Sequence, residues 1–236
     1  MEMIDDIMKK LDVGLVIFTK NEEKTIGWLI DRVCNWIDKK NVFVVDGHST
    51  DETVLIVKRK DICLFFDSKK GKGSAIQLAL DKIEKDILVF MDSDGSHSPE
   101  EIPLLLEPFL IYKDVAMVVG SRFKGGSEEF YGSFHEVVRF VGNVISVFFI
   151  NLIWRAKLTD VQNGFRAVKR NIIRNLSLTE DSFAIEQEMV MKCLKNKKKI
   201  VEVPSWELKR RYNNSHIISS RMLPKYIVSF IKNIFF

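Results

Sequence analysis

Short apolar runs alternate with helix-like patterns through the first half of the chain. The runs lie at residues 13–18, 41–45, 62–66, 87–91 and 116–120. Between them, apolar residues recur every three or four positions, which is the period of an amphipathic helix. Strands that are apolar at nearly every position are typical of a parallel sheet covered by helices on both faces. We therefore predict an α/β fold built on a mostly parallel, Rossmann-like sheet.

The second half of the chain has longer helical patterns and fewer strands. Apolar residues have helical spacing at residues 137–154, 183–194 and 216–236, and residues 200–204 form one more apolar run. Residues 123–133 are rich in glycine and acidic residues. This composition fits either a mobile loop over a site or a disordered connector.

Two of these helices carry more apolar surface than a solvent-exposed helix needs. Residues 137–154 are rich in Phe and Ile, and residues 216–236 combine an apolar stripe with Arg221, Lys225 and Lys232. Each helix either packs against the sheet or lies amphipathically in a membrane interface, where basic residues on the polar face are typical. For the C-terminal segment we favour the membrane interface.

The composition agrees with one sizeable domain in a reducing compartment. The chain has 236 residues and is 46% apolar, which is enough to bury its own core. Cys34, Cys63 and Cys193 are odd in number and far apart, so we expect reduced thiols rather than disulfides or a zinc site. The N-terminal residues lack the apolar core of a signal peptide. No run approaches the roughly 20 apolar residues that span a bilayer.

The net charge of +4 conceals an asymmetry along the chain. Residues 1–138 hold 18 Lys and Arg against 25 Asp and Glu, whereas residues 139–236 hold 18 against 7. The acidic part is suited to a metal ion, and the basic part is suited to an anionic partner or surface.

The apolar run at residues 87–91 ends in Asp92-Ser93-Asp94. Two carboxylates at the end of a buried strand repel each other unless a cation lies between them. Hard oxygen ligands of this kind suit Mg²⁺ or Mn²⁺, with the coordination completed by substrate phosphates. The alternative is a plain turn, since Asp, Ser and Gly also favour turns.

Polar groups follow all five predicted strands of the first half. In a parallel α/β sheet the ligand binds beyond the carboxyl ends of the strands, so that loops far apart in sequence meet there. Each group also has a plainer explanation as a helix cap, a turn or a solvated charge. Their coincidence favours one shared site made of Thr19, Asn21, Glu22, Asp46, Lys72, Asp92, Asp94 and Arg122.

Seven segments also match a known family in their order along the chain. They are FTKNEEKTIG, VVDGHSTDET, KGKGSAIQLAL, VFMDSDGSHSPEEI, VGSRF, RFVGN and DVQNGFRAVKR, within roughly residues 13–206. In this ordered set the chain resembles family-2 glycosyltransferases of the GT-A fold, and within them the dolichyl-phosphate mannose synthase and polyprenyl-phosphate glycosyltransferase branch. The resemblance implies a GT-A catalytic domain over residues 1–210 and an amphipathic basic tail over residues 211–236.

The resemblance implies that residues 1–138 bind the nucleotide-sugar and the metal. Asp92 and Asp94 would hold Mg²⁺ or Mn²⁺ against the diphosphate. Some relatives have Gln where this chain has Ser96, so a third protein ligand at Ser96 is open. The implied contacts to the donor are Thr19, Asn21, Glu22, Asp46, Lys72 and Ser93.

Residues 139–210 would form the acceptor half. Arg166 supplies a planar fork for a phosphate, or it forms a buried ion pair with Asp160. Relatives have Gly and Lys where this chain has Asn213 and His216, after Arg211. The cationic and polar groups implied for the acceptor side are Arg122, Arg139, Asn143, Arg166 and Arg211, with Glu188 as the matched acid.

These groups imply an enzyme that moves a sugar from GDP-mannose, a UDP-hexose or a UDP-N-acetylhexosamine to a polyprenyl (dolichyl) phosphate, with Asp94 and Arg122 as catalytic residues. A phosphate monoester is already anionic at neutral pH, so we expect direct, inverting attack without a dedicated base. Two alternatives stay open: transfer to a sugar hydroxyl, which requires a carboxylate base, and an inactive sugar-nucleotide binding module. We expect a cytoplasmic protein bound peripherally to the inner face of the membrane, without a nucleic-acid partner.

Overall fold

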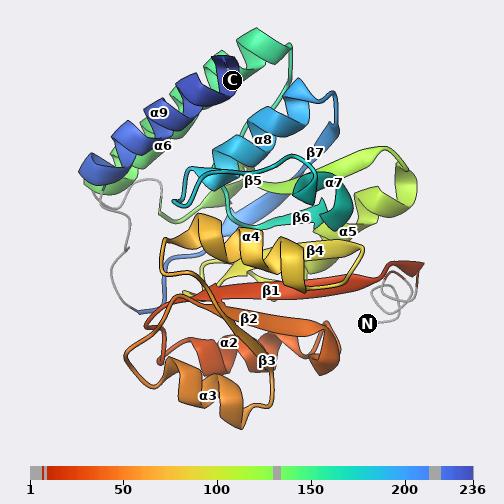
Figure 1. Ribbon diagram of the computed structural model, residues 1–236, viewed down its shortest axis with the longest axis vertical. Helices are drawn as coiled ribbons and strands as arrows, with labels where there is room; N and C mark the ends of the chain where they lie inside the picture. Colours follow the sequence, from red (N-terminus) through yellow and green to blue (C-terminus); the bar gives the residue numbers. More distant parts are fainter. Residues whose placement is uncertain (1–6, 8–9, 130–133, 213–218, 236) are drawn as a thin grey trace.

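The computed structural model describes residues 7, 10–129, 134–212 and 219–235 (Figure 1). In this part of the chain, seven strands form one sheet in the order β3-β2-β1-β4-β6-β5-β7. The strands are β1 (Val13–Thr19), β2 (Val42–Asp46), β3 (Cys63–Phe66), β4 (Ile87–Asp92), β5 (Val115–Ser127), β6 (Arg166–Lys169) and β7 (Lys199–Glu207). The helices are α2 (Ile26–Val33), α3 (Thr53–Arg59), α4 (Lys72–Lys82), α5 (Ile102–Ile111), α6 (Phe134–Trp154), α7 (Arg170–Arg174), α8 (Ile185–Lys195) and α9 (Ser219–Phe235), with short 3₁₀ turns η1 (Lys39–Asn41) and η2 (Pro99–Glu101).

Neighbouring strands run parallel except at β6, which is antiparallel to both β4 and β5. The predicted α/β fold with a mostly parallel sheet is therefore confirmed. We did not predict β6, because four residues with a charge at each end carry no usable periodicity. Its reversed direction matters for the site. The segment that leads into β6 lies at the carboxyl ends of β4 and β5, where the ligand of such a sheet is expected.

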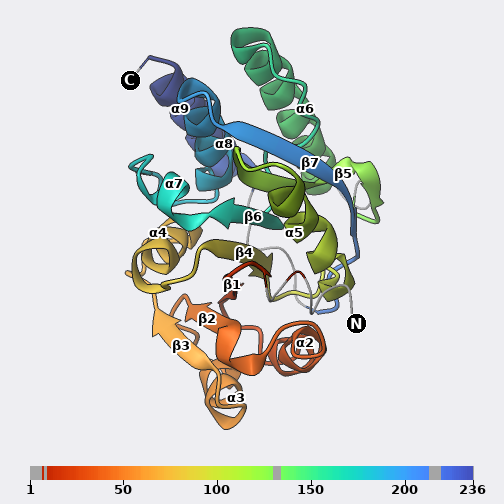
Figure 2. The same ribbon diagram turned by 90° about the vertical axis from the view of Figure 1, so that its right-hand side faces the viewer.

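Each face of the sheet has its own apolar core, because alternate side chains of a strand point to opposite faces. On β1, Leu15 and Ile17 join the core beneath α2 and α5, while Val16 and Phe18 join the core beneath α4 and α8. The two helical layers lie on opposite sides of the sheet in Figure 2. This arrangement confirms the prediction of helices on both faces.

β5 is longer than predicted and absorbs part of the glycine-rich segment. It continues to Ser127 and pairs there with β7. The strands approach so closely that a Cβ added at Gly125 would lie 2.2 Å from the carbonyl oxygen of Ser205. Glycine permits this close backbone approach, so the predicted loop is wrong for residues 123–127. Residues 130–133 lie outside the described part of the chain.

α6 and α9 lie side by side, and α9 also packs against α8 (Figure 1). α6 is 21 residues long. Among the described residues it is the one helix whose length and composition would suffice to cross a membrane, over Glu136–Trp154. The prediction that no segment approaches this length is wrong, because Arg139 and Asn143 interrupt the apolar run without ending the helix. The C-terminal segment docks on the domain through one face of α9, and residues 213–218 lie outside the described part.

Arg166 heads the large side chains that are completely buried among the described residues. Its guanidinium donates hydrogen bonds to the carbonyl oxygens of Asn163 and Glu186, at 3.0 Å from Nε and 2.9 Å from Nη1. Burial lowers the pKa of this guanidinium. Both roles expected for Arg166 are corrected, because carbonyl groups enclose it and Asp160 pairs with Arg122 instead. Arg166 ties the turn before β6 to the start of α8.

We expect Arg166→Leu to lower the free energy of unfolding by about 3 kcal/mol, since it removes the buried hydrogen bonds that the guanidinium donates to the carbonyl oxygens of Asn163 and Glu186. Urea unfolding followed by circular dichroism measures this loss. The matched control is Arg174→Leu, which removes a half-exposed ion pair with Asp81 and should cost at most about 1 kcal/mol. Equal losses in the two variants would contradict the structural role of Arg166.

Candidate active site

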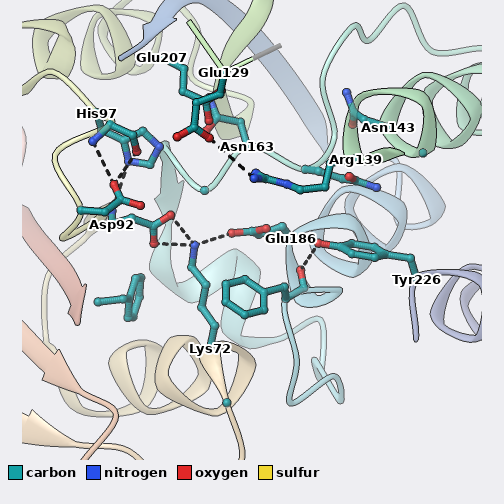
Figure 3. Close-up of a pocket in the computed structure, with 18 of the residues that line it drawn as sticks. Lys72, Asp92, His97, Glu129, Arg139, Asn143, Asn163, Glu186, Glu207 and Tyr226 are labelled. Carbon is teal, nitrogen blue, oxygen red and sulfur yellow. Dashed lines mark hydrogen bonds and ion pairs between the residues drawn. The ribbon is translucent and has the colours of Figure 1, made fainter. Parts of the chain in front are cut away.

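One cavity of about 830 Å³ lies at the carboxyl ends of β1, β4 and β5 and extends along α6 and α9. Its wall includes the starts of α4 and α8 and the end of β7, and Figure 3 shows the polar groups that point into it. The strand exits therefore meet in one pocket, as the sequence predicts. The predicted residues that line it are Thr19, Glu22, Lys72, Asp92, Ser93, Asp94, Ser96, Arg122, Arg139 and Asn143.

Lys72 lies between two carboxylates at the centre of the pocket (Figure 3). Its Nζ is 2.6 Å from Oδ1 of Asp92 and 2.7 Å from Oε1 of Glu186. Burial acts to raise the pKa of Asp92, but the Lys72 ammonium, aided by neighbouring cations, lowers it to about 2. Burial likewise acts to lower the pKa of Lys72, and the two carboxylates raise it. A Cβ at Gly164 would lie 2.6 Å from Nζ of Lys72, so a larger residue there would force this side chain to shift.

Asp94 is held from two sides. Its Oδ1 accepts hydrogen bonds from the backbone N–H and the hydroxyl of Ser96, at 3.0 and 2.6 Å. Its Oδ2 lies 2.9 Å from Nη2 of Arg210, which follows β7. Burial acts to lower the pKa of Arg210, but Asp94 and Glu129 raise it. Ser96 thus orients the Asp94 carboxylate so that its other oxygen faces Arg210.

Asp92 and Asp94 fit a divalent cation bound largely through substrate phosphates. The two carboxylates lie at or just after the end of β4, and each contacts a cationic side chain, so a divalent cation would share or replace these partners. Within the described residues, no group of three or more His, Cys, Asp or Glu side chains is arranged to hold a metal. Two carboxylates completed by phosphates and water are a common arrangement for Mg²⁺.

On the nucleotide side, the structure corrects two predicted contacts. Asp46 is fully buried and accepts hydrogen bonds from the backbone N–H and hydroxyl of Ser49, at 2.8 and 2.5 Å. Oδ1 of Asn21 accepts a hydrogen bond from the backbone N–H of Thr50 at 2.8 Å. Both side chains shape the loop after β2 and lie outside the pocket lining. Asp67, which follows β3, lines the pocket instead, and applying the strand-exit rule to β3 would have found it.

α6 lines the end of the pocket that contains Arg139, which we call the basic end. Arg139 and Asn143 both line the cavity and lie one helical turn apart. Oδ1 of Asn143 accepts a hydrogen bond from the backbone N–H of Val161 at 3.2 Å, whereas its buried Nδ2 has no hydrogen-bond partner among the described residues. A buried donor without a partner, beside an arginine, suits an anionic ligand.

Arg122 lines the pocket, but its guanidinium is committed to protein carboxylates. Nε and Nη2 lie 2.7 and 3.0 Å from the two oxygens of Asp160, and Nη1 lies 3.4 Å from Oε1 of Glu207. Burial acts to lower the pKa of Arg122, but both carboxylates raise it. This corrects its expected catalytic position, because the group is placed to hold two acids together.

Two further predicted residues, Glu188 and Arg211, lie outside the pocket lining, and a residue one or two positions earlier lines the pocket in place of each. Glu188 accepts hydrogen bonds from the backbone N–H groups of residues 179 and 180, while Glu186 reaches Lys72. Residues two apart on a helix point to different sides, so knowing the phase of α8 would have separated these acids. Arg211 stacks on Trp28, with Cζ 3.9 Å from the ring centroid, and Arg210 faces the pocket instead.

The acids Glu129 and Glu207 line the pocket near its basic end (Figure 3) and were not predicted as site residues, although Glu129 falls in the acidic segment 123–133 that fitted a loop over a site. Burial and the neighbouring charge of Glu207 raise the pKa of Glu129. Glu207 accepts a hydrogen bond from the hydroxyl of Ser127 and lies beside Arg122. Glu129 follows β5 and Glu207 ends the edge strand β7, and no family motif marked either position.

The pocket geometry agrees with a family assignment from sequence. The model of the family described as Glycosyl transferase family 2 matches residues 15–177, which is more than half of the chain. The chain belongs to glycosyl transferase family 2. The resemblance to this family and the prediction that the chain is a glycosyltransferase are both confirmed.

Two relatives illustrate the branch of this glycosyltransferase. It is 30% identical to UDP-N-acetylglucosamine–dolichyl-phosphate N-acetylglucosaminyltransferase of Methanococcus voltae over 215 residues, 81% of this chain and 84% of that protein. It is 29% identical to dolichol-phosphate mannosyltransferase of Pyrococcus furiosus over 209 residues, 82% of this chain. The match spans only 56% of the Pyrococcus protein.

Solved structures confirm the GT-A type of fold for this glycosyltransferase. Glucosyl-3-phosphoglycerate synthase from Mycobacterium tuberculosis, crystallised with Mn²⁺, UDP-glucose and phosphoglyceric acid, superposes with a TM-score of 0.77 at 20% identity. The superposition covers 98% of this chain and 82% of that one. At this identity the likeness concerns the fold alone.

We expect Gly164→Ala to raise the pKa of Asp92 from about 2, because the added Cβ displaces the Lys72 ammonium. The depressed pKa stabilises the folded protein above pH ~4, and this contribution is lost as the pH falls through about 2. The variant should therefore be less stable at neutral pH and lose less stability on acidification. Carboxyl ¹³C NMR titration and thermal unfolding measure both effects.

The control for this substitution is Gly142→Ala. Gly142 also lines the pocket, but a Cβ there meets nothing within 4 Å, so Asp92 should titrate as in the unchanged protein. An Asp92 pKa that stays near 2 in Gly164→Ala would show that Lys72 keeps its place without the glycine.

Proposed function

We propose that this glycosyltransferase moves a sugar from a nucleotide-sugar to a polyprenyl phosphate, with Mg²⁺ or Mn²⁺. The observation that carries the proposal is the course of the pocket. It begins at Asp92 and Asp94, passes Arg139, and reaches Ile145 and Ile227, which line the cavity and are also about half exposed. The acidic end suits a diphosphate donor with its metal ion, and the basic end suits a phosphate. The apolar mouth suits the isoprenoid chain that this phosphate carries.

The acidic end would bind the donor. Asp92 and Asp94 would hold the divalent cation, which neutralises the charge that develops on the departing diphosphate. Lys72 contacts both oxygens of Asp92, at 2.6 and 2.9 Å, which restricts the orientation of this carboxylate. Asp67 and the backbone near Gly47 lie further along the same wall, where they can contact the base and ribose.

The basic end would bind the acceptor. Arg139 and Nδ2 of Asn143, which has no hydrogen-bond partner in the described part of the chain, are both potential donors, and together they can hold a phosphate through N–H groups. The phosphate is anionic at neutral pH, so it can attack the anomeric carbon without transferring a proton to the enzyme. The step forms one C–O bond and breaks the bond to the diphosphate, which leaves as the nucleoside diphosphate.

One observation favours a second candidate, transfer to a sugar hydroxyl. Such a reaction requires a carboxylate base, and Glu129 is a pocket-lining carboxylate with a raised pKa close to Arg139. The apolar mouth of the pocket has no role in this alternative, so we prefer the lipid phosphate.

We also propose that the protein binds peripherally to the cytoplasmic face of a membrane through α6 and α9. The outer faces of the two helices carry a broad set of exposed apolar side chains, which is typical of an interfacial helix. On α9, Lys225 and Lys232 flank this surface and can contact anionic lipid. The exposed apolar residues are Val137, Val141, Val144, Ile145, Phe148, Phe149, Leu152 and Ile153 on α6, and Ile227, Val228, Ile231 and Phe235 on α9.

The enzymatic test is product analysis with UDP-N-acetylglucosamine, UDP-glucose and GDP-mannose, each offered with farnesyl phosphate and with a sugar alcohol acceptor. We expect a glycosylated farnesyl phosphate from one donor, in the presence of Mn²⁺. Asp94→Asn should lower this turnover by at least about 100-fold, because the charge stabilisation of the departing diphosphate is lost. Asp114→Asn, at an exposed ion pair with Lys199, is the control and should stay fully active. Product from the sugar alcohol alone would refute the lipid phosphate acceptor.

The membrane test is sedimentation with vesicles of phosphatidylcholine, with and without phosphatidylglycerol. We expect the double substitution Leu152→Ser, Val228→Ser to weaken binding at least about tenfold, because both side chains are more than 60% exposed and would be buried in the interface. High salt should weaken only the added affinity for phosphatidylglycerol. Ile111→Ser removes an equally exposed side chain on α5 and should leave binding unchanged. Undiminished sedimentation of the double variant would exclude this surface.

A further inference from the structure

Glu129 lies between the two ends of the pocket (Figure 3). Its Oε2 is 3.8 Å from Nη1 of Arg139, and its Oε1 is 3.8 Å from Nε of Arg210. Arg210 in turn reaches Asp94 with Nη2. The Glu129 side chain is only 10% exposed, so its charge is poorly screened by solvent. One carboxylate therefore contacts an arginine at the basic end and another at the acidic end.

Backbone contacts fix this carboxylate in place. The backbone N–H of Arg210 donates a hydrogen bond to Oε1 of Glu129 at 3.3 Å, and the backbone N–H of Glu129 donates to the hydroxyl of Ser127 at 3.1 Å. The preceding residue makes a parallel contact, since Oε2 of Glu128 accepts a hydrogen bond from the backbone N–H of Lys209 at 3.0 Å. These bonds join the segment after β5 to the segment after β7.

We propose that Glu129 is a positioning residue with two roles. It pairs with Arg139 when no acceptor is bound, so that it competes with the acceptor phosphate for this arginine, and it holds Arg210 at Asp94. The proposal rests on the proposed function, which assigns Arg139 to the acceptor phosphate. A carboxylate and a phosphate bind a guanidinium through the same N–H groups, so Arg139 exchanges one anion for the other. The Glu129 carboxylate, once released from Arg139, stays with Arg210. Binding of a phosphate at the acceptor end is thereby linked to Arg210, which contacts Asp94.

The two parts of this role can be separated by substitution. Glu129→Gln removes the charge that competes for Arg139, but keeps an oxygen that can accept the hydrogen bond from the Arg210 backbone. Glu129→Ala removes both the charge and the oxygen that accepts this hydrogen bond. Glu128→Gln makes the same chemical change one residue earlier, at an exposed side chain that contacts the Lys209 backbone. It is the matched control.

The experiment is titration calorimetry with two probes, farnesyl phosphate for the acceptor end and UDP with Mn²⁺ for the acidic end. We expect Glu129→Gln to bind farnesyl phosphate about three- to tenfold more tightly, because the phosphate no longer has to displace the Glu129 carboxylate from Arg139. Its affinity for UDP with Mn²⁺ should match that of the unchanged protein. Glu129→Ala should gain the same affinity for farnesyl phosphate and also change its affinity for UDP with Mn²⁺, since Arg210 is released from its backbone anchor. Glu128→Gln should bind both probes normally.

A second substitution tests the route of the effect. In Arg139→Ala, adding Glu129→Gln should bring no gain in farnesyl phosphate binding, because the contested arginine is absent. The positioning role is overturned, and the proposed function stands, if the unchanged protein binds farnesyl phosphate and Glu129→Gln binds it no better. Loss of turnover in Glu129→Gln without tighter binding would assign Glu129 as a base and likewise overturn the proposal. No binding of farnesyl phosphate by any of the proteins, with no transfer to it, would overturn both proposals together.

Discussion

The gathering of carboxylates at the strand ends is the constraint on which the site depends. β4 delivers Asp92 and Asp94 to the same edge of the sheet, and α8 adds Glu186 beside them. Buried like charges at such distances are tolerated only when cations lie between them. Lys72 and Arg210 supply these cations from within the chain, so the side chains of the pocket are already close to electrical balance.

This balance determines how ligands enter the site. A divalent cation near Asp94 or a phosphate near Arg139 does not meet a bare charge, because each of these groups already has a partner of opposite sign. Binding is then an exchange of partners, and its free energy is the difference between two ion pairs rather than the full strength of one. Differences of this kind are small enough to be tuned by a single neighbouring side chain, which is the position that Glu129 holds.

Sequence patterns predicted the fold wherever burial alone sets the pattern. β1 and β4 are apolar at nearly every position because both of their faces are covered, and six of the eight residues that the strand-exit rule predicted line one pocket. The other four predicted residues that line it, Ser93, Ser96, Arg139 and Asn143, came from the family resemblance. The misses share a physical cause. Helix phase decides whether Glu186 or Glu188 faces the pocket, and backbone direction decides between Arg210 and Arg211. Composition encodes neither. β6 was missed because its place is set by pairing with strands distant in sequence.

α6 shows why the apolar surface and the pocket have to be considered together. A helix that only crossed lipid would have no reason to carry Arg139 and Asn143, since polar groups in hydrocarbon are costly. In α6 both residues line the pocket, while Phe148 and Leu152 lie exposed on the outside. The helix thus contacts two environments, with Arg139, Asn143 and several apolar side chains toward the site and Phe148 and Leu152 away from it. That division favours α6 lying along a membrane surface, where a lipid-linked phosphate can reach Arg139 while its chain stays among apolar groups.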